Sequence, residues 1–338
     1  MNRFFLLMLP FLVLNTIFGQ TAFDLGLEAY DNGQYQEAID LYSKHIRSHN
    51  NGNTHFNRAL AYYKLGMNAE AIEDYTIVIN QDPTDFEAWH NRGLAYYDQG
   101  DLKKSFFDSK KTISLNPEYE KAYNTIGLCY SSWKKYQEAI ESYTQGIELT
   151  KNDLYYYNRA LAYQELKQFD KAEMDFTSAI NLNESIDYYW GRANLLYNNK
   201  DYAMSLEDYG TAIEMDSSIS SLFYNRGLSY YADYKDELAL NDFQKALSLD
   251  AEDIDAKWYI TLCQYELENY EESLNFYNQV VLQNPNYEYL NQLNKDELVK
   301  KTKLGNNLLY IVSLIALALL AIILFSKLFL KKEIPVRK

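Results

Sequence analysis

Three histidines lie close together in the sequence and are candidate ligands for a metal ion. His45 and His49 are four positions apart, which places both on one face of a helix, and His55 follows nearby. A stable site would also need cysteine or carboxylate ligands in a matching cluster, and the surrounding sequence has none. The chain also lacks a Gly-rich phosphate loop, an H-E-x-x-H motif and a G-x-S-x-G motif. We therefore expect no metal, no cofactor and no enzymatic activity.

Five arginines stand at positions where a helix would normally bury an apolar side chain. In the stretch HNRGLAYYDQG, Arg92 lies on the helix face formed by Trp89 and Tyr96. The same local pattern surrounds Arg58, Arg159, Arg192 and Arg226. A guanidinium group in such a place needs a carboxylate partner, because an isolated buried charge is strongly destabilising. The recurrence of one unusual residue also indicates that the sequence is built from repeats.

A repeat of 33 or 34 residues runs through most of the sequence. Segments such as YQEAIDLY and YQEAIESY are versions of one pattern that occurs eight times. The small residue of this pattern recurs at gaps of 33 or 34 positions as Ala38, Ala71, Ser105, Ala139, Ala172, Ser205, Ala239 and Ser273. A fixed period of this length is typical of solenoids, in which each unit buries its apolar face by stacking on its neighbours.

The chain resembles the tetratricopeptide repeat family, whose units are helix–turn–helix hairpins of about 34 residues. Trp89, Gly93 and Tyr96 match the family's positions four, eight and eleven, whereas Ser105 matches position twenty and Pro117 position thirty-two. The resemblance implies an all-α fold, a right-handed superhelical solenoid of eight helix–turn–helix repeats. The expected repeats are about 20–52, 53–85, 86–119, 120–152, 153–185, 186–219, 220–253 and 254–287, followed by a capping helix or linker over 288–304.

Aspartate recurs together with arginine in the same repeats. Arginine holds position seven in repeats 2, 3, 5, 6 and 7, and position twenty-three is aspartate in those five repeats and in no other. Pairing within one repeat matches every arginine, whereas pairing with the preceding or the following repeat matches only three. We therefore predict five structural pairs: Arg58–Asp74, Arg92–Asp108, Arg159–Asp175, Arg192–Asp208 and Arg226–Asp242. The alternative interpretation is solvated charge at a helix edge, as in typical surface ion pairs.

The resemblance also implies a concave surface lined by positions two, five, nine, twelve and thirteen of the first helices. Position five carries Phe56, His90, Tyr157, Trp190, Tyr224 and Trp258, and position twelve carries Tyr63, Tyr97, Tyr197, Tyr231 and Tyr265. Trp and Tyr are common anchors in recognition sites, so we predict that these residues bind a protein or peptide partner. The competing interpretation is burial against neighbouring first helices, which we favour for the leucines of position nine.

The composition indicates the class of partner. Of all residues, 47% are hydrophobic and 16% aromatic, so the chain can bury a large core. The 47 acidic and 32 basic residues leave a net charge of −15, which makes nucleic acid a poor partner. We expect a membrane-anchored scaffold whose exported repeats bind a partner that carries basic and apolar residues. The alternative function is a glycan-binding or polysaccharide-export accessory module, because aromatic grooves also stack on sugar rings.

Both ends of the sequence carry apolar segments. Residues 1–19 have the pattern of a secretory signal peptide, with an uncleaved anchor as the alternative. The uncharged run Leu308–Ser326 would form a helix of about 28 Å, so we predict a transmembrane helix over 305–326 and a basic cytoplasmic tail over 327–338. The predicted localisation is therefore a single-pass membrane protein with its repeats outside the cytoplasm, the expected compartment being the periplasmic side of a bacterial inner membrane.

Overall fold

The structure is a computed structural model that describes residues 21–330. Within that range the chain forms 17 α-helices and one short 3₁₀ helix, and no strand. The predicted all-helical repeat fold is thereby confirmed. The predicted signal peptide over 1–19 and the tail from residue 331 onward lie outside the described residues. The chain divides between residues 184 and 185 into two units, each of which is described separately below.

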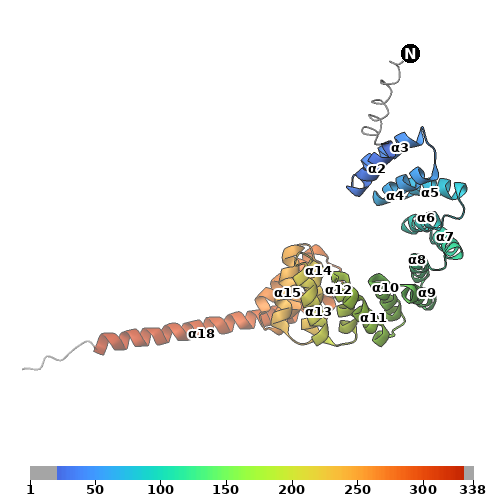
Figure 1. Cartoon of the computed structure of the whole chain (residues 1–338). Coiled ribbons are helices and arrows are strands. Elements are labelled where there is room, and N and C mark those ends of the chain that lie inside the picture. The colour runs from blue at the N-terminus through green and yellow to red at the C-terminus, as the bar shows by residue number, and fades with distance from the viewer. Residues whose placement is uncertain (1–20, 331–338) are drawn as a thin grey trace, which may run out of the picture. The chain divides into compact units, whose positions relative to one another are not determined.

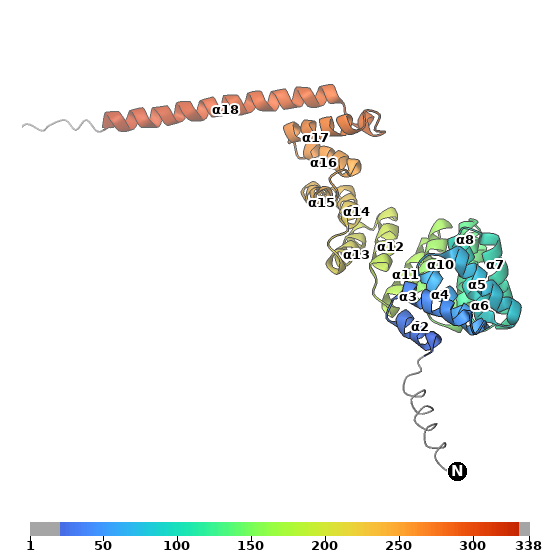
Figure 2. The same ribbon diagram turned by 90° about the horizontal axis from the view of Figure 1, so that it is seen from above.

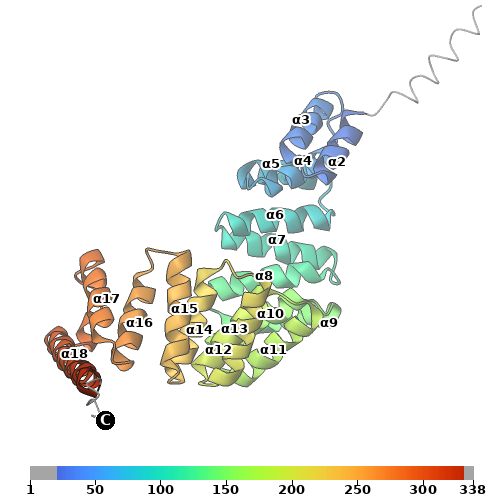
Figure 3. The ribbon, with the colours of Figure 1, turned by 90° about the vertical axis from the view of Figure 1, so that its left-hand side faces the viewer.

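The first unit, over its described residues 21–184, consists of five consecutive helical hairpins (Figure 1). Each helix packs on the next helix along the chain, and each first helix also contacts the first helix of the next hairpin. Figure 3 shows this stacking for α6, α7 and α8. The five hairpins are α2 (Ala22–Asp31) with α3 (Tyr35–Ile46), α4 (Gly52–Lys64) with α5 (Asn68–Gln81), α6 (Phe86–Asp98) with α7 (Leu102–Leu115), α8 (Glu120–Ser132) with α9 (Tyr136–Leu149), and α10 (Asp153–Glu165) with α11 (Phe169–Leu182).

The second unit begins at residue 185 and contains three hairpins and a long final helix. The hairpins are α12 (Ile186–Asn198) with α13 (Tyr202–Met215), α14 (Ser220–Ala232) with α15 (Asp236–Leu249), and α16 (Ile254–Glu266) with α17 (Tyr270–Gln283). The 3₁₀ helix η1 (Leu290–Gln292) follows, and then α18 (Lys295–Leu330). Figure 2 shows that α18 begins beside α17 and continues beyond it.

Short polar residues and left-handed turn residues set the limits of these helices. The residues Asn51, Asp85, Asn152 and Asp253 each accept a backbone hydrogen bond from the first turn of the helix that follows. Such a cap stabilises a helix by about 1 kcal/mol because it satisfies a backbone donor that has no partner within the helix. The turn inside each hairpin holds one residue at positive φ, which is glycine in the first three hairpins (Gly33, Gly66 and Gly100) and Lys134, Lys167, Lys200, Tyr234 or Glu268 in the others.

Small residues let the two helices of a hairpin approach closely. Ala38, Ala71 and Ala139 are fully buried at the repeated small position of the second helices. Gly127 shows how little space remains on a first helix, since a Cβ atom there would lie 2.4 Å from the ring of Tyr143. The alternation of small and aromatic side chains therefore follows from the close packing of the hairpin.

The end of the repeat array is covered by the residues that follow it. Tyr287, Leu293 and Leu298 are buried in one apolar cluster with Trp258 and Val280. Lys301 reaches back to the first helix of the last hairpin, where its Nζ atom donates to the hydroxyl of Tyr265 at 2.7 Å. These contacts shield the apolar face that the last hairpin would otherwise expose.

The structure contradicts the predicted transmembrane helix over 305–326. No helix in the described range 21–330 is long and apolar enough to cross a membrane. α18 does cover the segment in question, but its first turns carry Lys295, Asp296 and Glu297. The single-pass topology and the localisation that depended on this helix are therefore withdrawn.

Candidate functional site

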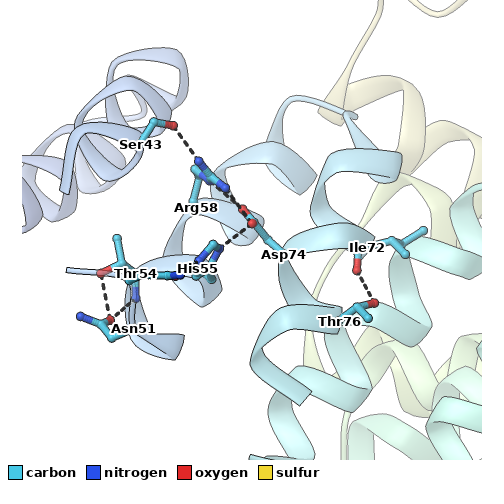
Figure 4. Close-up of polar contacts among 9 residues, drawn as sticks. Ser43, Asn51, Thr54, His55, Arg58, Ile72, Asp74 and Thr76 are labelled. Carbon is cyan, nitrogen blue, oxygen red and sulfur yellow. Dashed lines mark hydrogen bonds and ion pairs between the residues drawn. The ribbon is translucent and has the colours of Figure 1, made fainter. Parts of the chain in front are cut away.

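Each of the five predicted arginines lies beside the aspartate of its own repeat. The Nε and Nη2 atoms of Arg58 donate to the two carboxylate oxygens of Asp74 at 2.7 and 2.8 Å (Figure 4). The same two-point contact joins Arg92 to Asp108, Arg159 to Asp175, Arg192 to Asp208 and Arg226 to Asp242. The aspartate side chains are only 2–8% exposed and the arginine side chains 12–22%. The pairs therefore lie inside the hairpins rather than on a solvated edge.

A third hydrogen bond, which the pairing of arginine with aspartate does not predict, links some arginines to the preceding repeat. The Nη1 atom of Arg58 donates to the hydroxyl of Ser43 at 2.9 Å. Arg92 reaches Thr76 in the same way at 3.1 Å, and Arg159 reaches Thr144 at 2.9 Å. The signal was present in the sequence, because a hydroxyl residue stands 15 or 16 positions before each of these arginines. Each network thus holds two consecutive repeats together.

Aromatic rings complete the surroundings of the guanidinium groups. The guanidinium carbon of Arg92 lies 4.7 Å from the ring centre of Trp89 and 5.8 Å from that of Tyr96. Rings in this position attract a cation and replace part of the water that burial removes. Burial raises the pKa of Asp108 while the Arg92 guanidinium lowers it. The networks are enclosed by packed side chains, so their role is to hold the fold together and not to contact a substrate.

The three histidines with metal-like spacing serve other purposes. His55 is 4% exposed, and its Nδ1 atom lies 2.7 Å from a carboxylate oxygen of Asp74 (Figure 4). Its Nε2 atom lies 2.7 Å from the side-chain oxygen of Asn50. It therefore belongs to the Arg58–Asp74 network. The rings of His45 and His49 pack edge to face with their centres 4.8 Å apart. No group of three or more His, Cys, Asp or Glu side chains that could hold a metal ion occurs among the described residues.

Two of the eleven aromatic residues predicted to bind a partner are buried in the core. His90 is 3% exposed and Trp258 is 1% exposed. In both repeats the last residue is a tyrosine that covers the ring, since Tyr119 lies 5.0 Å from His90 and Tyr287 lies 5.9 Å from Trp258 between ring centres. Burial, and secondarily the charge of Lys121, lowers the pKa of His90 to about 4. A tyrosine at the end of the repeat was the signal for this burial in the sequence.

The other nine predicted residues are half-buried on first helices. They are Phe56, Tyr63, Tyr97 and Tyr157 in the first unit and Trp190, Tyr197, Tyr224, Tyr231 and Tyr265 in the second. In the first unit, Phe56 and Tyr157 rest edge-on against core rings, and Tyr97 lies within 3.3 Å of the Ser132 hydroxyl. Burial and a hydrogen bond to Asp98 raise the pKa of Tyr63. The leucines of position nine, expected to be buried, are also only half-buried, and Leu161 is 38% exposed.

The second unit brings four of these aromatic residues together on the neighbouring helices α12 and α14. Trp190 and Tyr224 pack partly against the buried cluster around Leu222. Tyr224 and Tyr231 both contact the ring of Tyr259, at 5.9 and 5.6 Å between ring centres. Burial, followed by Tyr259 and Asp255, raises the pKa of Tyr224. We call Trp190, Tyr197, Tyr224 and Tyr231 the α12–α14 aromatic surface; the ring of Tyr265 lies apart from it, beneath Lys301 at 4.3 Å.

Three solved structures are similar to this chain over 54–79% of its length. A tetratricopeptide repeat protein from Parabacteroides merdae is 21% identical to this chain, with a TM-score of 0.54. The match covers 72% of this chain and 97% of that protein. The Cut9–Hcn1 hetero-tetramer of the APC/C is 13% identical with a TM-score of 0.53, covering 79% of this chain and 52% of its own. YrrB, a TPR protein with an unusual peptide-binding site, is 21% identical with a TM-score of 0.47, covering 54% of this chain and 95% of its own. No curated protein matches the sequence.

Models of one repeat family match along most of the sequence. Models described as tetratricopeptide repeat match residues 23–75, 86–119, 120–153, 154–185, 186–219 and 255–287, and a model described as TPR repeat matches residues 59–100. The matched segments cover more than half of the chain and lie within the array of helical hairpins. The chain therefore belongs to the tetratricopeptide repeat family.

Proposed function

We propose that this protein is a scaffold that binds a protein or peptide partner on its first helices, with the α12–α14 aromatic surface as the main contact. The observation that carries this proposal is the grouping of Trp190, Tyr197, Tyr224 and Tyr231, all half-buried, on neighbouring first helices. Large aromatic side chains that keep part of their surface in water gain free energy when a partner covers them, at a small cost in side-chain entropy.

Acidic side chains border this surface and suggest the chemistry of the partner. Asp187 and Asp255 are exposed at position two of α12 and α16. Neither carboxylate forms an ion pair with any residue in the range 21–330. The arginines of α12 and α14, Arg192 and Arg226, are committed to Asp208 and Asp242 inside the hairpins. A partner that combines apolar with basic residues therefore fits this surface best.

The test is crosslinking capture of partners from cells that make the protein, with the full chain as bait. Tyr197→Ala and Tyr231→Ala each remove one ring from the α12–α14 aromatic surface. We expect each change to weaken capture of one specific protein by about tenfold or more, because a central aromatic anchor contributes about 2 kcal/mol. Asp187→Asn should weaken capture by a smaller factor, since it removes only one charge at the border.

Tyr234→Ala is the matched control, because Tyr234 is 91% exposed in the turn between α14 and α15 and lies outside the surface. Equal capture by all three tyrosine variants would contradict the proposal. Retention of the bait by an insoluble glycan, lost in Tyr197→Ala and Tyr231→Ala, would instead support the glycan-binding alternative. Thermal unfolding of every variant checks that the hairpins remain folded.

A further inference from the structure

The second helix of the third repeat carries a cluster of positive charge around an exposed aromatic ring. On α7, Phe107 is 63% exposed, although phenylalanine is usually buried. Lys103 and Lys104 stand four and three positions before it, and Lys110 and Lys111 stand three and four positions after it. Residues at these spacings share one face of a helix. We call these five residues the α7 basic face.

Other repeats place different residues at the same positions. In the flanking hairpins, the residues equivalent to Lys104 and Phe107 are Glu70 and Glu73 on α5 and Glu138 and Glu141 on α9. The position of Lys110 is held in the flanking repeats by Thr76 and Thr144, whose hydroxyl groups accept from an arginine of the next repeat. The repeat after α7 has Ile126 in place of that arginine, so no hydrogen-bond acceptor is required at the position of Lys110.

The charges of the α7 basic face are largely unneutralised. Lys104 forms an exposed ion pair with Asp101 at 2.8 Å, and Lys103, Lys110 and Lys111 form none with any residue in the described part of the chain. Asp108, the acidic residue of α7, is buried and paired with Arg92. The Phe107 ring lies edge to face with the half-buried Trp89 ring, with ring centres 6.2 Å apart. The face therefore offers an apolar centre together with three lysines that form no ion pair and with Lys104, whose ion pair is exposed.

We infer that the α7 basic face is a second interaction surface, separate from the α12–α14 aromatic surface, and that it binds an acidic protein segment bearing an apolar side chain. Carboxylates of such a segment would pair with the lysines while its apolar side chain covers Phe107. A narrow peptide can contact one helix without meeting the glutamates of α5 and α9. A membrane or a nucleic acid presents a broad anionic surface, which those glutamates and the net charge of −15 repel.

A displayed library of random peptides, selected on the full chain, tests the inference. We expect enriched peptides to combine Asp or Glu with one aromatic or aliphatic residue. Their affinity should fall about tenfold or more in Lys103→Glu/Lys110→Glu, because repulsion replaces attraction at two contacts. Phe107→Ala should also weaken binding, and added salt should weaken the binding of wild type more than that of the double variant.

Lys44→Glu/Lys171→Glu is the matched control, since it makes the same change of net charge at exposed lysines of α3 and α11. The inference is overturned if both double variants bind the peptides equally, or if the enriched peptides lack acidic residues. It is also overturned if phosphatidylserine vesicles or double-stranded DNA bind through these lysines and acidic peptides do not. Tyr197→Ala and Tyr231→Ala should leave binding of the acidic peptides unchanged, so failure here is distinguishable from failure of the proposed function.

Discussion

Arg159 and Asp175 form a two-point ion pair inside the hairpin of α10 and α11, with Nε···Oδ2 and Nη2···Oδ1 distances of 2.7 and 2.8 Å. The arginine also donates to Thr144 of the preceding repeat. Because both side chains are mostly removed from water, each one depends on the other for its stability in the fold. The equivalent pair is absent from the hairpin of α8 and α9, where Ile126 and Ser142 occupy the two positions.

A double-mutant cycle measures this dependence. Arg159→Leu and Asp175→Leu should each lower the free energy of unfolding by about 3 kcal/mol, since each leaves one buried charge without its partner. The double variant should lose less than either single variant, because an apolar pair replaces the ion pair. Urea unfolding followed by circular dichroism gives the three differences. Losses that simply add in the double variant would show that the two side chains are not coupled.

The arginine network predicts a stabilising substitution at Gly210. This glycine lies in α13, 16 positions before Arg226, where Thr76 stands relative to Arg92. A Cβ atom at Gly210 would meet no atom within 4 Å. Gly210→Thr should therefore add an acceptor for the guanidinium of Arg226, and the comparison with Gly210→Val isolates the hydroxyl group. We expect threonine to raise the free energy of unfolding by about 1 kcal/mol over valine. Equal stability of the two variants would argue against the added hydrogen bond.

Because His90 is buried, we expect the free energy of unfolding of the protein to fall in mild acid. Burial lowers its pKa to about 4, whereas an unfolded histidine titrates near about 6.5. Between these values the unfolded chain binds a proton that the folded chain does not, so stability is complete above about pH 6.5 and falls as the pH decreases toward about 4. His90→Phe should remove this component. The difference in unfolding free energy between pH 7 and pH 4.5 should then shrink by about 2–3 kcal/mol relative to wild type.

The control for this experiment is His49→Phe, which changes an exposed histidine on the surface of the first unit. Carboxylates titrate in the same pH range, and comparing variants at fixed pH subtracts their common contribution. The same pH dependence in wild type and His90→Phe would mean that His90 is not kept neutral by its surroundings.

Replacing a turn residue that has a positive φ by glycine is also expected to stabilise the protein. Lys167 has a φ of 57° in the turn between α10 and α11, a conformation that strains a side chain bearing a Cβ atom. Gly66 holds the equivalent position in an earlier hairpin at a φ of 73°. Lys167→Gly should raise the free energy of unfolding by about 1 kcal/mol, and Gly66→Ala should lower it by a similar amount. The prediction is contradicted if thermal unfolding of both variants matches wild type.

The helical hairpins and the charge pairs could both be predicted from the order of residues along the chain. The repeat period and the recurrence of arginine with aspartate 16 positions later already pointed to pairs within each repeat, because the hairpin brings those two positions together wherever it forms. Local periodicity is a property of the chain alone, so it can be recognised without the fold.

Only the tertiary structure decided which aromatic side chains remain accessible and which groups complete each network. The rings of His90 and Trp258 are covered by Tyr119 and Tyr287 at the ends of their repeats, and Tyr265 is covered by Lys301. Exposure depends on side chains that reach a position from a loop or from the next helix, and helical periodicity does not encode their directions. The hydroxyl residues 15 or 16 positions before three of the arginines are visible in the sequence, but only the stacking of the hairpins shows that they accept hydrogen bonds from those arginines.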